Sequence, residues 1–283
     1  MKILVVNIPT GEENGPFGDW ARNVYVPFLK KNIDLVKAPG TEVTYRFADK
    51  GMGPLEMAFY RYLDHLAGEM VFKAAQNADK EGFDAVMIDC FGDPMLYELR
   101  QSLNIPVVGI GEGALLVATM MGWKFGMVNV SPYNIPEQQE RVVKYGIADK
   151  CVGHVAVEGW EAGDDGDLVD ASNKVERFIK SARKLIDMGA EVIVPACSIT
   201  SPMVRFCPGA EDKYPNGITE IDGVPVLDSV GSAFKMAETL ASLKNGGSSW
   251  ISRVGQYAQP SDRVRKDAHE ITDNTKYTFW DVV

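Results

Sequence analysis

The 283-residue chain has few histidines, few cysteines and no excess of basic residues. Its 29 lysines and arginines stand against 39 acidic residues, so the net charge is −10 and we expect no nucleic-acid-binding or polybasic membrane surface. None of the three histidines is spaced as a ligand pair, so we expect no metal site. Four cysteines are too few for a disulfide scaffold, which predicts free thiols and a reducing, cytoplasmic location.

Long hydrophobic runs are also absent. No run approaches the roughly 20 apolar residues needed to span a bilayer, and the apolar part of the opening segment MKILVVNIP is too short for a signal peptide. No G-x-S-x-G motif marks a nucleophile elbow, which argues against a Ser-His-Asp hydrolase. These absences predict an acidic cytoplasmic protein that binds neither nucleic acid nor a membrane.

The sequence does contain an alternation of short Val- and Ile-rich runs with longer amphipathic segments. This pattern predicts an α/β fold with parallel sheet covered by helices on both faces. The predicted strands lie at 2–8, 43–47, 85–89, 107–110, 125–130, 152–157, 192–195 and 224–227. The predicted helices lie at 20–36, 55–80, 95–102, 113–121, 137–145, 171–188 and 231–243.

Two segments fall outside this alternation. The acidic, glycine-rich segment 158–170 lacks the ligand spacing of an EF-hand, so we interpret it as a solvated loop. After residue 243 the periodicity weakens and turn-forming residues become frequent. We therefore expect residues 244–283 to form a C-terminal extension that wraps the core or a neighbouring subunit.

Two cysteine-containing segments repeat each other. GFDAVMIDC ends at Cys90 and GAEVIVPAC ends at Cys197; in each, a glycine lies eight residues before the thiol and an acid stands third. Downstream, IPVVGIGEGA (105–114) matches VPVLDSVGSA (224–233), since in both an alanine follows a proline by eight residues. The repeat predicts an internal duplication into two α/β halves, the first at 1–110 plus 224–243 and the second at 111–223.

Each repeated cysteine stands where a buried strand gives way to a turn. Ligands of open α/β sheets bind outside the carboxyl ends of the strands, so two related halves would place Cys90 and Cys197 on opposite sides of one cleft. A lone cysteine after an apolar run is usually a small core residue. That is our interpretation of Cys151 and Cys207, whereas the matched context of the other two favours a functional pair.

Two opposed thiols suit proton transfer on carbon. A thiolate is a usable base and a thiol a usable acid once their pKa values are tuned, and backbone N–H groups after each strand would favour the thiolate. One cysteine would remove a proton from a carbon next to a carbonyl, and the other would return a proton to the opposite face. The predicted product is the mirror-image centre, and no cofactor is needed.

Several motifs resemble those of the aspartate/glutamate/hydantoin racemase superfamily, most closely its hydantoin racemase branch. The resemblance covers about residues 1–243. The matching pieces are KILVVN (2–7), GPLE (53–56), DAVMIDCFGDP (84–94), IPVVGIGEGA (105–114), WKFGMVNVSP (123–132) and GAEVIVPAC (189–197).

The resemblance implies two pseudo-symmetric, flavodoxin-like halves with parallel sheets and the active site in the cleft between them. It implies cofactor-independent racemisation or epimerisation of a hydantoin-like or amino-acid-like compound, with Cys90 and Cys197 as the acid/base pair. It also implies a homo-oligomer, to which the unexplained extension could contribute. The substrate-binding residues carried over from the family are Asn7, Phe91, Gly92, Asn129, Ser131, Ser198 and Ile199.

The chain departs from the family pattern around both cysteines. Ile8 and Pro9 stand within the usual Asn-Pro-Asn-Thr, and Met95 replaces the glycine of Asp-Pro-Gly. Asn129 replaces the usual threonine, and Ala-Cys-Ser-Ile replaces Gly-Cys-Ala-Gly at Cys197. These changes predict a retained chemistry and a rebuilt pocket, so the carbonyl or carboxylate substrate stays open.

The same scaffold supports other reactions. A maleate-like diacid could undergo cis–trans isomerisation after covalent addition of Cys90, and a ring-opening reaction would use the same nucleophile. A malonate-type decarboxylase needs only the cysteine of the second half, so the presence of Cys90 argues against it. A non-catalytic binding protein would tolerate the loss of either thiol.

The segment GIGEGA (109–114) fits the G-x-G-x-x-A fingerprint of dinucleotide-binding proteins. It follows the fourth predicted strand rather than the first, and no acidic residue stands about 20 positions later at a strand end. Nucleotide binding is therefore a weak alternative.

Overall fold

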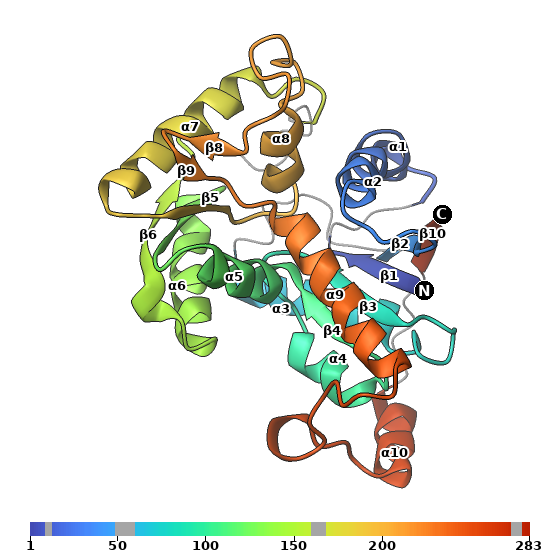
Figure 1. The fold of residues 1–283 in the computed structure, drawn as a ribbon. Coiled ribbons are helices and arrows are strands. Elements are labelled where there is room, and N and C mark those ends of the chain that lie inside the picture. The colour runs from blue at the N-terminus through green and yellow to red at the C-terminus, as the bar shows by residue number, and fades with distance from the viewer. Residues whose placement is uncertain (9–12, 49–59, 160–167, 273–278) are drawn as a thin grey trace.

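The structure is a computed structural model that describes residues 1–8, 13–48, 60–159, 168–272 and 279–283. Two mainly parallel sheets, each flanked by helices, make up the two halves of the molecule (Figure 1). The predicted α/β fold is therefore confirmed. No helix in the described ranges is both long enough and apolar enough to cross a membrane.

The first sheet has the order β10-β2-β1-β3-β4. The four strands β2, β1, β3 and β4 are parallel, and β10 joins β2 at one edge in antiparallel orientation. The strands are β1 (Lys2–Asn7), β2 (Glu42–Ala48), β3 (Ala85–Asp89), β4 (Val107–Gly109) and β10 (Phe279–Val282).

The second sheet has the order β6-β5-β7, all parallel. Val226 adds a further parallel bridge to Ile193, on the side of β7 away from β5. In chain order, both halves thus place their strands as second-first-third-fourth, which is the flavodoxin-like order. The strands are β5 (Phe125–Asn129), β6 (Cys151–Ala156) and β7 (Val192–Pro195), and β8 (Glu220–Ile221) and β9 (Val224–Pro225) form a separate antiparallel pair.

Helices separate the strands nearly as the sequence predicts. They are α1 (Pro16–Trp20), the π-helical turn η1 (Ala21–Tyr25), α2 (Val26–Asp34), α3 (Arg61–Ala75), α4 (Leu96–Ser102), α5 (Ile110–Met121), α6 (Ile135–Lys144), α7 (Ser172–Asp187), α8 (Thr200–Phe206), α9 (Ser229–Asn245) and α10 (Asp262–Thr272), with short 3-10 turns at Pro132–Asn134, Ala148–Lys150 and Gly255–Tyr257. Residues 55–59 of the helix predicted over 55–80 lie outside the described residues.

Alternating side chains bury both faces of the first sheet. In β1, Ile3 and Val5 face the core shared with α2, α9 and the second half, whereas Leu4 and Val6 face α3 and α4. All four side chains are fully buried. A strand buried on both faces must be apolar throughout, which is why its Val- and Ile-rich run predicts it correctly.

Helices α5 and α9 pack closely between the two sheets (Figure 1). The approach depends on Gly113, because a Cβ there would lie 3.0 Å from the Cα of Ala233. Helix α9 packs on β3 and β4, although the chain just before it pairs with β7 through Val226. The division into 1–110 plus 224–243 and 111–223 stays a prediction.

The described part of the C-terminal extension packs against the first half of the same chain. The turn at Gly255–Tyr257 packs on α4, and β10 pairs with β2. Arg253 donates to the carbonyl oxygens of Arg100 and Leu103 at 2.8 and 2.6 Å. The predicted homo-oligomer stays a prediction.

Candidate active site

Both repeated cysteines end a strand in the same way. Cys90 follows β3, and its sulfur accepts a hydrogen bond from the N–H of Gly92 at 3.3 Å. Cys197 comes two residues after β7, and its sulfur accepts from the N–H of Ile199, also at 3.3 Å. In both segments the donor lies two residues after the thiol, so the two strand ends match down to the hydrogen bond that favours a thiolate.

The surroundings shift the pKa of each thiol. Burial raises the pKa of Cys90 well above its usual value, the charges of Asp64 and Cys197 raise it further, and Gly92 and Arg141 lower it. The two neighbours that favour the Cys90 thiolate are therefore the N–H of the following turn and the Arg141 guanidinium.

Cys197 has a more favourable set of neighbours. Burial raises its pKa and Asp89 adds to the rise, but the N–H groups of Thr200 and Ile199 and the Thr200 hydroxyl lower it. The pKa of Cys90 is raised well above its usual value, whereas the donors near Cys197 offset more of the rise there, so we expect Cys197 to lose its proton first.

Two asparagines stand beside the cysteine-bearing strands. Asn7 ends β1 opposite Asp89, the residue before Cys90. Asn129 ends β5, one position beyond the pairing of Val128 with Pro195, and therefore lies level with the residue before Cys197. Both side chains are buried.

The orientation of both amides is set by the main chain. Asn7 donates its amide N–H to the carbonyl of Arg46 at 3.4 Å, and Asn129 donates to that of Met127 at 3.2 Å. Their Oδ1 atoms are buried and have no hydrogen-bond partner among the described residues. An unpaired buried acceptor is costly, so these oxygens suit a ligand that supplies N–H groups.

The remaining predicted ligand residues have identifiable contacts. Phe91 is buried in the core, and the Ser131 hydroxyl accepts from the N–H of Tyr133 at 3.2 Å. Ser198 is buried with its Oγ 3.2 Å from the hydroxyl of Tyr25. Their roles in binding stay predictions.

Tyr25 is a site residue that the sequence interpretation missed. Its hydroxyl donates to Asp89 Oδ2 at 2.6 Å and lies next to Ser198 Oγ, so it joins the residue before Cys90 to the residue after Cys197. Tyr25 ends the π-helical turn η1, a form of helix that is frequent at functional sites. Burial raises its pKa further above the normal range, so the hydroxyl stays protonated.

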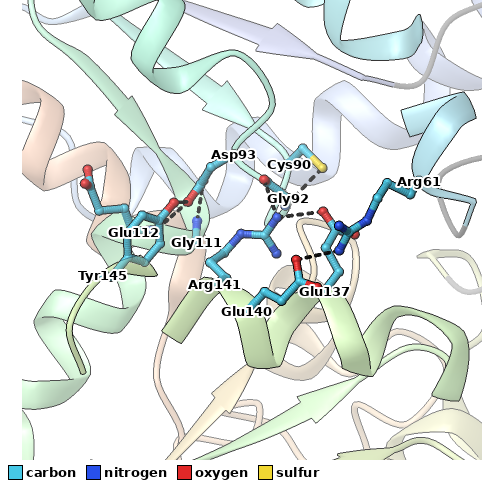
Figure 2. Close-up of polar contacts among 10 residues, drawn as sticks. All are labelled: Arg61, Cys90, Gly92, Asp93, Gly111, Glu112, Glu137, Glu140, Arg141 and Tyr145. Carbon is cyan, nitrogen blue, oxygen red and sulfur yellow. Dashed lines mark hydrogen bonds and ion pairs between the residues drawn. The ribbon is translucent and has the colours of Figure 1, made fainter. Parts of the chain in front are cut away.

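Asp93 explains the first two glycines of GIGEGA, Gly109 and Gly111. Its carboxylate accepts from the N–H groups of Gly111 and Glu112 at 2.8 and 2.6 Å and from the hydroxyl of Tyr145 at 2.5 Å (Figure 2). A Cβ on Gly109 would lie 2.0 Å from Asp93 Oδ1. The N-terminus of α5 is thus filled by a side chain of the protein, which argues against a bound dinucleotide phosphate at this turn.

We expect Asp93→Ala to lower the free energy of unfolding by about 2–4 kcal/mol, because it leaves buried donors unpaired at the start of α5. Urea unfolding measures this. Asp170→Ala is the matched control, since Asp170 accepts from the N–H of Ser172 at the exposed start of α7. The control should lose about 1 kcal/mol or less, and equal losses would contradict the assigned role of Asp93.

Arg141 reaches the Cys90 turn from α6, in the other half. Its guanidinium donates to the carbonyl of Gly92 at 2.5 Å and to Glu137 at 2.8 Å (Figure 2). It is buried, and its Nη1 has no hydrogen-bond partner among the described residues. The same turn that offers an N–H to the Cys90 sulfur is therefore held by a cation that also favours the thiolate.

A cavity of about 900 Å³ borders this turn between α3, α4 and α6. An ion pair between Arg61 and Glu140, 2.5 Å apart, joins α3 to α6 beside it (Figure 2). Between α2 and α8, by contrast, Phe28 and Phe206 pack edge-to-face with their ring centroids 5.6 Å apart. The cavity reaches Gly92 and Asp93, the residues that follow Cys90 in the turn. Its charged lining side chains are Arg61, Asp64, Asp93, Glu98, Glu137, Glu140, Arg141 and Lys144.

Burial raises the pKa of Asp89 to about 7, only partly offset by the Tyr25 hydrogen bond. Because the folded state holds this proton more tightly, the stabilisation is complete below the unfolded pKa near 4 and is lost as pH rises through about 7. We expect Asp89→Asn to gain on the order of 3 kcal/mol of unfolding free energy over the parent between pH 5 and pH 8. Urea unfolding at both pH values tests this, and a constant difference would contradict it.

The other two cysteines lack this setting. Cys207 is buried in the core, and the Cys151 sulfur lies 3.5 Å from His154 Nε2 on the edge strand β6. Burial raises the pKa of Cys151 and lowers that of His154, which favours a neutral pair. Across the described ranges no group of three or more His, Cys, Asp or Glu side chains is arranged to hold a metal ion.

Comparison with known proteins identifies the family. The family model described as Asp/Glu/Hydantoin racemase matches residues 55–237, which is more than half of the chain. The chain belongs to this family. It is therefore an enzyme of the isomerase class, and the recognition of the family from its sequence motifs is confirmed.

Several relatives have names that state an activity. A hydantoin racemase of Rhizobium meliloti is 30% identical over 185 residues, which is 65% of this chain and 70% of the relative. Another, of Paenarthrobacter aurescens, is 26% identical over 81% of this chain and 89% of its own length.

Solved structures share the fold. The allantoin racemase of Klebsiella pneumoniae has a TM-score of 0.70 at 23% identity and covers 93% of this chain and 94% of its own. The allantoin racemase of Pseudomonas fluorescens has a TM-score of 0.67 at 25% identity, covering 92% and 97%.

Proposed function

We propose that this racemase acts on a cyclic ureide, a hydantoin-like ring, and that Cys90 and Cys197 are its acid/base pair. The supporting observation is the matched geometry of the two thiols, each at a strand end with an N–H from the second residue after it. Thiols that served only packing would not need the same donor in both halves. The names of the hydantoin and allantoin racemases point to the same substrate class.

The proton transfer would run as follows. The Cys197 thiolate takes the proton from the ring carbon next to a carbonyl, and the electron pair moves into that carbonyl as an enolate. The Cys90 thiol gives its proton to the opposite face of the carbon, leaving a Cys90 thiolate and a Cys197 thiol. Reaction from the other enantiomer reverses these roles, so the chemistry itself needs no cofactor.

The unpaired acceptors favour a ureide over a diacid. Asn7 Oδ1, Asn129 Oδ1 and Asp89 Oδ1 are buried without partners among the described residues. A hydantoin ring supplies N–H donors next to its carbonyls, whereas a dicarboxylate supplies acceptors only. The ring carbon that loses its proton stands between a ring N–H and one carbonyl, and the carbanion is delocalised into that carbonyl as an enolate, which brings the C–H within reach of a thiolate.

Optical rotation tests this proposal. Single enantiomers of 5-benzylhydantoin, allantoin and glutamate are incubated with the protein, and maleate is followed in parallel for isomerisation. We expect rotation to be lost with at least one cyclic ureide and to persist with glutamate, while maleate stays unchanged. Turnover of glutamate or maleate alone, or no turnover of any ureide, would contradict the proposal.

A further inference from the structure

The C-terminal strand β10 is fixed firmly to the first sheet. Trp280 stands opposite Phe47 of β2, and their rings stack with centroids 5.0 Å apart and planes 21° apart. The next residue, Asp281, accepts from the Arg46 Nε at 2.8 Å. Trp280 and Arg46 are both buried, so this contact is part of the core rather than of the surface.

The stacking continues from β10 to the π-helical turn η1. Phe47 packs edge-to-face on Tyr25 with centroids 6.5 Å apart. From the same turn, the Arg22 guanidinium lies 5.0 Å from the Trp280 ring centre. The turn that carries Tyr25 therefore rests on Trp280 through two routes, a ring contact and a cation–π contact.

Tyr25 in turn touches both cysteine segments. Its hydroxyl reaches Asp89 of the first half and Ser198 of the second, each next in sequence to one of the two thiols. Ser198 is also next to Ile199, whose N–H binds the Cys197 sulfur. A displacement of Tyr25 would thus move the donor that favours the Cys197 thiolate.

We propose that Tyr25 is a positioning residue for the two thiols and that Trp280 of the C-terminal extension holds it in place. The extension would then be a working part of the site, although it lies outside the region that matches the family. The inference rests on the proposed function only in the experiments that measure kcat, because those need a substrate. Thiol reactivity tests it independently of any substrate.

Tyr25→Phe removes the hydroxyl and keeps the ring contacts. We expect kcat to fall about 10-fold to 100-fold with little change in KM, since small misplacements of reacting groups have effects of this size. Alkylation of Cys197 by iodoacetamide at pH 8, followed by mass spectrometry of its peptide, should slow about 3-fold or more, because Ser198 loses its contact with Tyr25 and the neighbouring Ile199 N–H is held less firmly against the thiolate. A merely structural tyrosine would leave this alkylation rate unchanged in the folded variant.

Trp280→Ala in the full chain should lower kcat and slow Cys197 alkylation in the same way. Trp280→Phe should keep both close to the parent values because it retains a stacking ring. Trp250→Ala is the matched control: it removes another tryptophan of the extension, one whose ring is 5.4 Å from Arg253. The control should keep kcat and Cys197 alkylation within about 2-fold of the parent. Circular dichroism identifies any variant that fails to fold. If Trp280→Ala fails, Trp280→Leu replaces it, because leucine keeps much of the buried volume but provides no stacking ring.

The double variant gives the sharpest test. If Trp280 acts through Tyr25, Tyr25→Phe combined with Trp280→Ala should slow Cys197 alkylation no further than the more affected single variant. Losses that multiply, or alkylation rates within about 2-fold of the parent in both folded single variants, would overturn the proposal. If the parent shows no racemisation but alkylation responds as expected, the proposed function fails and the positioning role stands.

Discussion

Cys90→Ala and Cys197→Ala are each expected to lower the rate of racemisation by about 10³-fold or more. Each thiol takes one half of the proton transfer, and a positioned acid or base accounts for about 10²–10⁴-fold in rate. The thiols act in sequence on the same carbon, so removing both should cost little more than removing either. Because the two enantiomers have the same free energy, kcat/KM must fall equally in both directions.

Cys151→Ala is the matched control for the loss of either thiol. Cys151 is also a partly buried cysteine with a hydrogen-bond partner, but it lies on β6 next to His154. Its removal should leave kcat within about 2-fold of the parent. A folded Cys90→Ala variant with the activity of this control would reduce the site to a single working thiol and would favour decarboxylase-like chemistry.

Arg141→Met is expected to lower kcat by about 10-fold to 100-fold. Two losses combine here: the anchor on the Gly92 carbonyl, and the positive charge that lowers the pKa of Cys90. Without that charge, burial, Asp64 and Cys197 raise the pKa of Cys90 unopposed except by the Gly92 N–H. The pH profile of kcat should therefore move to higher pH, which a loss of packing alone would not cause.

Two further variants test this role of Arg141. Arg141→Lys keeps the positive charge but not both hydrogen bonds, to the Gly92 carbonyl and to Glu137. It should therefore bring the pH profile closer to that of the parent than it brings kcat. Arg183 lies on the outer helix α7, and Arg183→Met breaks its exposed ion pair with Asp222. This variant should change neither kcat nor its pH profile. An unshifted pH profile in a folded Arg141→Met variant would contradict the electrostatic part of the assignment.

The strands around the site were predictable because they are local and apolar. β3 and β7 occur at the predicted residues, since a run such as 85–89 is buried on both faces. The short helix α8 was missed because it follows directly on the Cys197 turn. The edge strand β10 was also missed, because its partner β2 lies more than 200 residues earlier in the chain.

The missed site residues are those whose role depends on distant partners. Tyr25 resembles any core aromatic until the fold brings it to Asp89, 64 positions away, and to Ser198, 173 positions away. Arg141 lies on an amphipathic helix, where charges normally face water, yet it is buried against the Cys90 turn of the other half. Neither contact leaves a pattern in the local sequence.

Hydrogen exchange at the stereocentre tests the two-thiol account most directly. Each enantiomer of a turned-over ureide is incubated in D2O with the parent, Cys90→Ala and Cys197→Ala, and proton NMR follows the C–H signal beside optical rotation. We expect the parent to exchange and racemise both enantiomers. Each variant should racemise neither and exchange at most one, with the exchanged enantiomer opposite in the two variants. Racemisation by either folded variant, or exchange of the same enantiomer by both, would contradict the account.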